Sequence, residues 1–428
     1  MSTVQPLTQP TTDTIRAEFE AVRQQTERLC EPVSEADLTV QAAVFASPGK
    51  WHLAHTTWFF ERFILTELGR DYAVFDPRFD FLFNSYYNAV GARQPQGLRG
   101  LLTRPSLADV MAYRHHVTER LLAALPDLIE RGLQDRIVLG LHHEQQHQEL
   151  LLTDLLYLFA ASPLQPAYRS QKPEHLQATA LPPHAQATGW LAFEGGLRDV
   201  GHAGDGFAFD HETPRHQALI QPFRLATRPV SNADWAAFIA DGGYTTPALW
   251  LSDGWNWVQT EQIRHPLYWT APDLDAPGMT LDGLCPLAAA APVCHVSYFE
   301  ADAYARWAGK RLPTEFEWEV AAAGQPVEGN FVETAALRPM SVQGAKDTLQ
   351  QLFGDVWEWT ASPFMPYPGF RAAVGAIGEY NGKFMNGQYV LRGGSCVSPR
   401  RHLRASYRNF FYPSQRWQFT GLRLAEDM

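Results

Sequence analysis

The stretch HHEQQHQELLLTD, residues 142–154, contains two histidines, His143 and His147, that are four residues apart. If the stretch is helical, both imidazoles lie on one side, about one turn apart, and Asp154 shares that side. Two neutral imidazoles at this spacing can bind one metal ion, and a third ligand must then come from elsewhere in the chain. The stretch therefore predicts a helix that carries two ligands of a metal site.

The helical periodicity extends over the first third of the chain. Apolar residues recur at intervals of three and four, which predicts long helices at roughly 12–30, 48–68, 106–126 and 130–160. Four helices in one domain are typical of a bundle. Ser47 and Pro48 predict the start of the second helix, with a serine N-cap and a proline in the first turn. The region 69–105 is long for a connection, and such loops are often functional.

The second predicted helix offers the third ligand. It contains WHLAHTTWFFE, with His52 and His55, and two facing helices of a bundle can bring three imidazoles together. We expect His52 and His142 to be polar residues on the exposed surface. His115 and His116 have no partner at ligand spacing, and we expect them to be solvated.

Residues 143–147 also match the H-E-x-x-H pattern of zinc peptidases. Such an enzyme needs a further ligand downstream, but the sequence that follows lacks the usual extension. The next glutamate beyond this helix, Glu174, falls in a proline-rich stretch, so we interpret the match as coincidental. Three imidazoles can hold zinc or iron(II), and their spacing does not decide between the two.

Composition excludes several classes of protein. The chain has 428 residues and a net charge of −11, without the basic clusters that nucleic-acid binding requires. No apolar run is long enough to cross a membrane, and the first twenty residues lack the pattern of a secretory signal. The four cysteines form no CxxC pair, which is typical of a reducing compartment. We therefore expect a cytoplasmic protein without nucleic-acid or membrane partners.

The chain is predicted to have an α+β fold in two domains. We expect a helical bundle over 1–165, a proline-rich polar linker over 166–187 and a second domain over 188–428. The second domain is rich in Gly, Pro and Trp and has few long helical periods, which indicates a compact α+β domain. One exception is the stretch 297–310, SYFEADAYARWAGK, which predicts an amphipathic helix.

Several motifs of the second domain resemble those of a known fold. They are FDHETPRH (209–216), GKRLPTEFEWEVAA (309–322), GDVWEWT (354–360), LRGGSCVSPRRHLRASYRNFF (391–411) and FTGLRL (419–424). These motifs resemble the formylglycine-generating-enzyme fold, a C-type-lectin-like domain. Joined to a helical domain of the DinB type, such a domain resembles the iron-dependent sulfoxide synthases of ergothioneine biosynthesis. Formylglycine generation itself depends on a cysteine pair in the C-terminal core, where Cys396 stands alone.

The resemblance implies a metal set and a reaction. It assigns iron(II) to His55, His143 and His147, and it implies that a sulfur donor is joined to C2 of the imidazole of hercynine (Nα-trimethylhistidine) with dioxygen. It also brings Tyr86 and Tyr87 of NSYYN near the iron, where a phenol can supply a proton.

The resemblance further implies how hercynine is bound. Gln146 would hydrogen-bond its imidazole. Asn409, Phe410 and Phe411 would surround its trimethylammonium group, for which aromatic faces are suited.

The donor is the open part of this prediction. The loop 91–105 reads GARQPQGLRGLLTRP, with Gln94 and Gln96 where the cysteine-using branch of the family is expected to have cationic residues. Arg93 remains, with Arg99 and Arg104, and could hold a donor carboxylate. Cysteine or γ-glutamylcysteine is one candidate donor. A selenosugar, as in the sister group that makes selenoneine, is the other. A zinc-dependent thiol transferase or hydrolase of the DinB type, and a ligand-binding protein without catalysis, also stay open.

Overall fold

The computed structural model describes residues 11–169, 188–204, 206–341 and 347–428. The chain divides into two compact units. The first, here called the helical unit, comprises Met1–Leu158, Ala203–Phe209 and Ala373–Tyr380. The second, the sheet unit, comprises Phe159–His202, Asp210–Ala372 and Asn381–Met428. Most of the predicted linker, residues 170–187, lies outside the described residues, so the predicted domain boundaries stay predictions.

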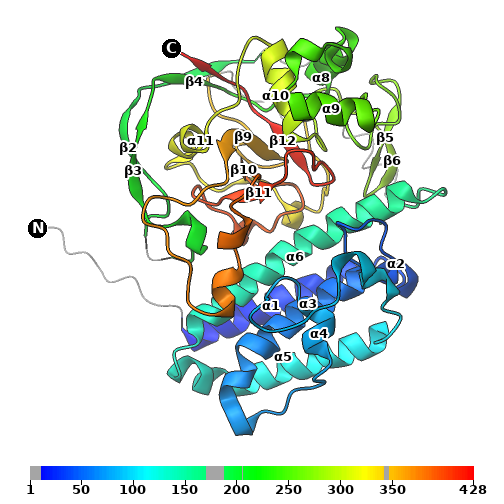
Figure 1. The fold of residues 1–428 in the computed structure, drawn as a ribbon, viewed down its shortest axis with the longest axis vertical. Coiled ribbons are helices and arrows are strands. Elements are labelled where there is room, and N and C mark those ends of the chain that lie inside the picture. The colour runs from blue at the N-terminus through cyan, green and yellow to red at the C-terminus, as the bar shows by residue number, and fades with distance from the viewer. Residues whose placement is uncertain (1–10, 170–187, 205, 342–346) are drawn as a thin grey trace, which may run out of the picture. The chain divides into compact units, whose positions relative to one another are not determined.

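The helical unit is built on four long helices, close to the predicted places (Figure 1, blue to blue-green). They are α1 (Thr12–Cys30), α3 (Gly49–Phe63), α5 (Leu107–Glu130) and α6 (Gln134–Ala161). In α5, Val110, Val117 and Leu121 recur at helical spacing and are buried, which places its apolar face in the bundle core. None of the described helices is both long and apolar enough to cross a membrane.

The start of α3 differs from the prediction. The helix begins at Gly49 after Pro48, and no side chain caps it. Ser47 instead connects two other elements, because its backbone N–H donates to Asp154 Oδ2 (2.8 Å) and its hydroxyl accepts from Arg99 Nη1 (2.8 Å). The predicted serine cap was therefore wrong, since the hydroxyl is used for a tertiary contact.

The predicted long loop 69–105 contains only short helical turns. These and the other short helices of the unit are α2 (Glu35–Thr39), α4 (Phe79–Phe83), η1 (Leu65–Asp71), η2 (Gln96–Leu101) and η7 (Ala376–Glu379).

The sheet unit has a four-stranded sheet at its centre, in the order β11-β10-β9-β12. Strand β12 runs parallel to β9, and the other neighbours are antiparallel. A three-stranded sheet has the order β1-β4-β13, and three two-stranded ribbons pair β2 with β3, β5 with β6 and β7 with β8. The strands are β1 (Trp190–Phe193), β2 (Gly196–Val200), β3 (His216–Ile220), β4 (Phe223–Ala226), β5 (Pro277–Thr280), β6 (Gly283–Pro286), β7 (Gly329–Asn330), β8 (Phe353–Gly354), β9 (Trp357–Pro363), β10 (Tyr389–Arg392), β11 (Asn409–Phe411), β12 (Thr420–Leu422) and β13 (Ala425–Asp427).

Four helices of the sheet unit are α8 (Asn232–Ala240), α9 (Ser252–Thr260), α10 (Tyr298–Trp307) and α11 (Glu315–Ala322). Helix α10 confirms the amphipathic helix predicted at 297–310. Ser297 caps it, and its side chain accepts from the N–H of Glu300, three residues later.

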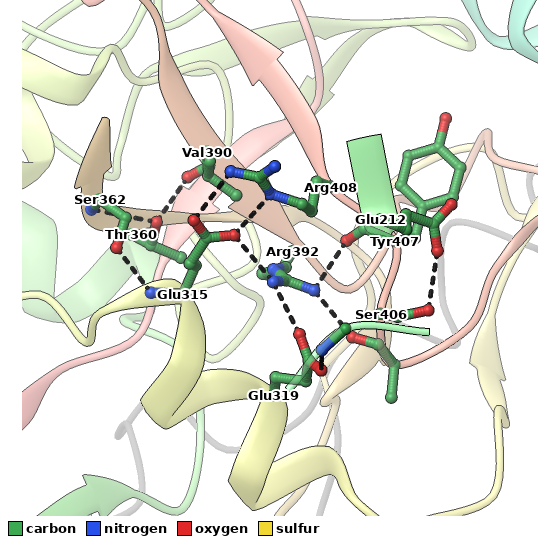
Figure 2. A network of polar contacts seen from close by, with 12 residues as sticks. Glu212, Glu315, Glu319, Thr360, Ser362, Val390, Arg392, Ser406, Tyr407 and Arg408 are labelled. Carbon is green, nitrogen blue, oxygen red and sulfur yellow. Dashed lines mark hydrogen bonds and ion pairs between the residues drawn. The ribbon is translucent and has the colours of Figure 1, made fainter. Parts of the chain in front are cut away.

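A buried ion network ties α11 to the central sheet (Figure 2). Arg392 of β10 donates to Glu315 Oε2 and to Glu319 Oε2, both at 2.9 Å. Arg408 donates to the same Glu315 carboxylate at 2.8 and 3.0 Å. Both guanidinium groups are almost completely buried, so each depends on these partners to offset its desolvation.

Candidate metal centre

The structure brings the three predicted ligands together inside the helical unit. His55 comes from α3, and His143 and His147 come from α6. Their ligand atoms all lie within 4.8 Å of one another, and Nε2 of His55 is 3.1 Å from Nε2 of His143. Exposed fractions of 0%, 1% and 9%, respectively, show that the site is closed to bulk water on most sides.

All three imidazoles are held neutral. Burial lowers the pKa of His143 to about 3 and lowers the pKa values of His55 and His147 well below the usual range. The charge that each ring would carry also repels the others, which adds to the effect for His55 and His147. A neutral imidazole is the form that binds a metal, so the donor set fits a divalent cation.

In two of the three histidines, a hydrogen bond to Nδ1 leaves Nε2 available for a metal ion. Nδ1 of His55 donates to the carbonyl of Phe83 (2.6 Å), which leaves its Nε2 as the acceptor. Nδ1 of His147 is 2.8 Å from Nδ1 of His52, and Nε2 of His52 is 3.1 Å from Asp154 Oδ2. An ionised carboxylate can only accept, so His52 donates to Asp154 and accepts from His147. This Asp154–His52 relay leaves Nε2 of His147 free of a proton.

The prediction for His52 was wrong. Its side chain is 2% exposed instead of lying on the surface. Every residue of α3 except Arg62 is buried, so this helix has no exposed side on which a histidine could lie. His142 is half-buried, and its ring stacks on Phe207 with centroids 3.9 Å apart, so it too is not simply exposed. His115, 58% exposed, is solvated as predicted, but His116 is half-buried, with its ring 5.3 Å from that of Phe75, so the prediction for it was wrong.

The glutamate of the H-E-x-x-H pattern faces away from the histidines. Glu144 is completely buried and accepts hydrogen bonds from Arg23 (3.0 Å), Thr26 (2.7 Å) and Arg114. Burial alone would raise its pKa, but the two guanidinium groups outweigh that effect and lower the pKa to about 2. Its carboxylate is therefore bound to α1 and α5, and it is not placed to act as the general base of a peptidase.

Aromatic rings fix the orientation of His55. The ring of Trp51 stacks on it at 4.5 Å with planes 12° apart, and Trp58 stacks at 5.6 Å. Arg99 lies over Trp51, with its Cζ 3.5 Å from the ring centroid. Burial lowers the pKa of Arg99 to about 9. Arg93, in contrast, is exposed and donates to the carbonyl of Ser85 (2.7 Å).

The two tyrosines of NSYYN have different surroundings. Tyr87 is completely buried, and its ring packs at 5.0 Å from Phe63 and 5.7 Å from Trp58. Burial raises its pKa well above the usual value. Tyr86 is half-buried, and its ring lies 4.6 Å from Tyr87. The ring of Tyr87 is packed on its neighbours, and a catalytic role for either residue stays a prediction.

A third tyrosine, which sequence reasoning missed, lies at the ligands. The ring centroid of Tyr380 is 5.6 Å from that of His143, and its hydroxyl donates to Oε1 of Gln146. Phe209 stacks on the Tyr380 ring at 5.5 Å. Tyr380 follows Gln146 by 234 residues, and no local pattern in the sequence indicates this contact.

The residues predicted for the hercynine cation belong to the sheet unit. Asn409, Phe410 and Phe411 form β11, and all three are half-buried. Asn409 Oδ1 accepts from the N–H of Phe410 (2.9 Å), and the Phe410 ring stacks on Phe364 at 4.0 Å. One face of Phe410 is thus already covered, and the binding role of these residues stays a prediction.

Two known domain families match the chain. The DinB superfamily matches residues 18–151, and the sulfatase-modifying factor enzyme 1-like domain matches residues 177–347 and 340–428. Together they confirm the predicted α+β combination of a DinB-like helical domain and a formylglycine-generating-enzyme-like domain.

Two relatives are similar to this chain over more than nine tenths of its length. The hercynine oxygenase of Mycolicibacterium smegmatis is 34% identical and covers 97% of this chain and 99% of its own. The hercynine oxygenase of Mycobacterium tuberculosis is also 34% identical, over 92% of this chain and 94% of its own. The formylglycine-generating enzyme of Streptomyces coelicolor is 31% identical over only 56% of this chain. The chain therefore belongs to the hercynine oxygenase family, and it is an oxygenase.

Proposed function

We propose that this protein is a non-heme iron(II) enzyme that uses dioxygen to form a carbon–chalcogen bond at C2 of the hercynine imidazole. The observation that carries the proposal is the set of three neutral, buried imidazoles on α3 and α6. The whole-length similarity to hercynine oxygenases supports hercynine as the acceptor. The four cysteines are free thiols, which supports the predicted cytoplasmic location.

His55, His143 and His147 would hold the iron. Because all three are neutral, the ion keeps its full charge and has open positions for other ligands. When bound, iron(II) supplies the redox chemistry for dioxygen and an affinity for a soft thiolate or selenolate. The same three imidazoles could hold zinc, as in a DinB-type thiol transferase or hydrolase, and such an enzyme would consume no oxygen.

Gln146 would bind the acceptor, hercynine, beside the histidine ligands, and Tyr380 would orient Gln146. A neutral amide can hydrogen-bond an imidazole without competing for the metal. The hydrogen bond from the Tyr380 hydroxyl fixes the Oε1 end of Gln146 and so orients the amide. We assign the proton-donor role to Tyr380, whose ring contacts that of His143, with the predicted Tyr86 and Tyr87 as the alternatives. Asn409, Phe410 and Phe411 would bind the trimethylammonium cation.

The donor is proposed to be a thiol, cysteine or γ-glutamylcysteine, with a selenosugar as the second candidate. Gln94 Nε2 donates to the carbonyl of Leu98 (3.2 Å) and Gln96 Nε2 donates to that of Phe45 (2.9 Å). These amides bind backbone within the helical unit and offer no charge to a carboxylate. Arg99 is stacked on Trp51, so Arg93 and Arg104 are the exposed cations among the described residues of this loop. Two neutral amides at these positions leave fewer cations for a donor carboxylate, and this favours the selenosugar, which is neutral.

The test compares donors under identical conditions. Iron-loaded protein, hercynine and dioxygen are incubated with cysteine, γ-glutamylcysteine or a selenosugar, and the products are identified by mass spectrometry. A hercynine sulfoxide conjugate from a thiol supports the first proposal. A selenium conjugate from the selenosugar alone moves the donor to selenium. The absence of any conjugate with all three donors would remove the proposed function.

A further inference from the structure

A carboxylate anchors the segment that carries Tyr380. Glu379 Oε2 accepts from the backbone N–H of Asn88 (2.9 Å), and its Oε1 accepts from the N–H of Ala89 (2.7 Å). We call these two bonds the Glu379 clip. They join segments 291 and 290 residues apart in the sequence, and both belong to the helical unit.

The clip fixes position and direction together. Hydrogen bonds from backbone N–H groups to a carboxylate are charge-assisted, and two parallel bonds restrict rotation as one cannot. The stretch 371–375, shortly before Glu379, is exposed, and Val374 is fully so, whereas residues 376–378 are half-buried. The Glu379 carboxylate thus holds the segment that carries Tyr380 to the backbone of Asn88 and Ala89.

Tyr380 follows this anchor directly and contacts the ligand set. Its side chain is 6% exposed and is bounded by Phe209, by the ring of Tyr86 at 6.3 Å and by His143. Its hydroxyl reaches Gln146. A shift of the Glu379 backbone would move the phenol, and a displacement of about 1 Å at a reacting centre can cost roughly a hundredfold in rate.

We propose that Glu379 is a positioning residue, which holds the Tyr380 phenol on Gln146 beside His143. For the reaction itself this inference rests on the proposed function, whereas the clip and its effect on Tyr380 do not. A purely structural role for Glu379 makes a different prediction, because it would lower stability and activity whether or not residue 380 has a hydroxyl.

The first experiment uses a double-mutant cycle on the full-length, iron-loaded enzyme. Glu379→Gln keeps the shape but removes the charge, and we expect it to lower kcat about tenfold at unchanged iron content. Glu379→Asp should recover part of the loss. In a Tyr380→Phe background the same Glu379→Gln change should cost less than about twofold. Glu130→Gln, at an exposed position of α5, is the matched control. Unchanged kcat in Glu379→Gln, or a tenfold loss in both backgrounds, would overturn the inference.

The second experiment does not depend on turnover. Nitration by tetranitromethane, followed by mass spectrometry, reports whether Tyr380 is accessible in the folded protein. We expect Glu379→Ala to raise the nitration rate of Tyr380 at least about fivefold, and to leave buried Tyr87 slow as an internal control. Amide hydrogen exchange at Asn88 and Ala89 should rise in the same variant. Unchanged nitration and exchange would contradict the clip. If the wild-type protein is inactive while these rates rise, the proposed function fails and the clip stands.

Discussion

Helix α6 contributes adjacent residues to two buried polar clusters, one of neutral side chains and one of charged side chains. On one side, His143 and His147 are kept neutral by burial. On the other, Glu144 is kept charged by Arg23 and Arg114. Successive residues of a helix point about 100° apart, so one short motif serves two separate environments. Peptidases share the H-E-x-x-H pattern. The role of each side chain, in a metal site or in an ion network, depends on the residues that surround it.

The largest effect is expected from removing a ligand. His143→Ala should weaken iron binding by more than about a hundredfold, because changing residues that only support ligands already costs ten- to a hundredfold. Iron titration and bound-metal analysis measure this, with His115→Ala as the matched exposed control. If the His143→Ala variant binds iron as tightly as the wild type, His143 is not a metal ligand.

The opposite side of α6 should matter for stability instead. Glu144→Ala leaves Arg23 buried without its carboxylate partner and leaves Arg114 paired only with Glu27, which should cost roughly 3–5 kcal/mol of unfolding free energy. Urea denaturation of the metal-free protein provides the measurement. Protein that remains folded should still bind iron. Full stability combined with lost iron binding would mean that Glu144 belongs to the metal site after all.

The two sides should also respond to acid in different pH windows. The pKa of Glu144 is lowered from an ordinary 4.5 to about 2, so its contribution, roughly 3 kcal/mol, is present above pH 4.5 and lost as the pH falls toward 2. His143, lowered from 6.5 to about 3, takes up a proton more readily when unfolded, so the metal-free protein loses stability from pH 6.5 downward. Urea denaturation at several pH values should show both windows. His143→Ala should reduce only the upper one, and an unaltered upper window would argue against this account.

A smaller effect is expected from the Asp154–His52 relay. His52→Ala or Asp154→Asn should weaken iron binding about ten- to a hundredfold, because Nδ1 of His147 loses its acceptor or that acceptor loses its orientation. Iron affinity by competition with a chelator is the readout. Equal affinities in wild type and both variants would show that His147 is oriented without the relay.

The smallest effect is expected at Tyr87. Its ring packs among Trp58, Phe59 and Phe63, so Tyr87→Phe should keep kcat within about fivefold, equivalent to about 1 kcal/mol. Steady-state turnover with hercynine is the measurement. A loss of several hundredfold would move the proton-donor role from Tyr380 to Tyr87.

Local pattern was enough to predict much of the bundle and the pairing of two histidines on one helix. The places of α1, α5 and α6 follow from apolar spacing, and His143 and His147 follow from one turn of helix. His52 was misplaced because a helix buried on nearly all sides has no periodic signal for exposure. The Ser47 cap was wrong because Asp154 and Arg99 compete for that residue. Tyr380 and Glu379 depend on contacts between segments more than 200 residues apart, which no local spacing encodes.

Oxygen uptake tests the central claim most directly. It is followed with iron-loaded protein and a thiol donor, with and without hercynine, beside zinc-loaded protein and His143→Ala. We predict uptake that requires both iron and hercynine and that is absent from the zinc-loaded protein and from the variant. Uptake that does not depend on hercynine, or turnover that zinc supports without oxygen, would contradict the assignment of this metal centre to an iron oxygenase.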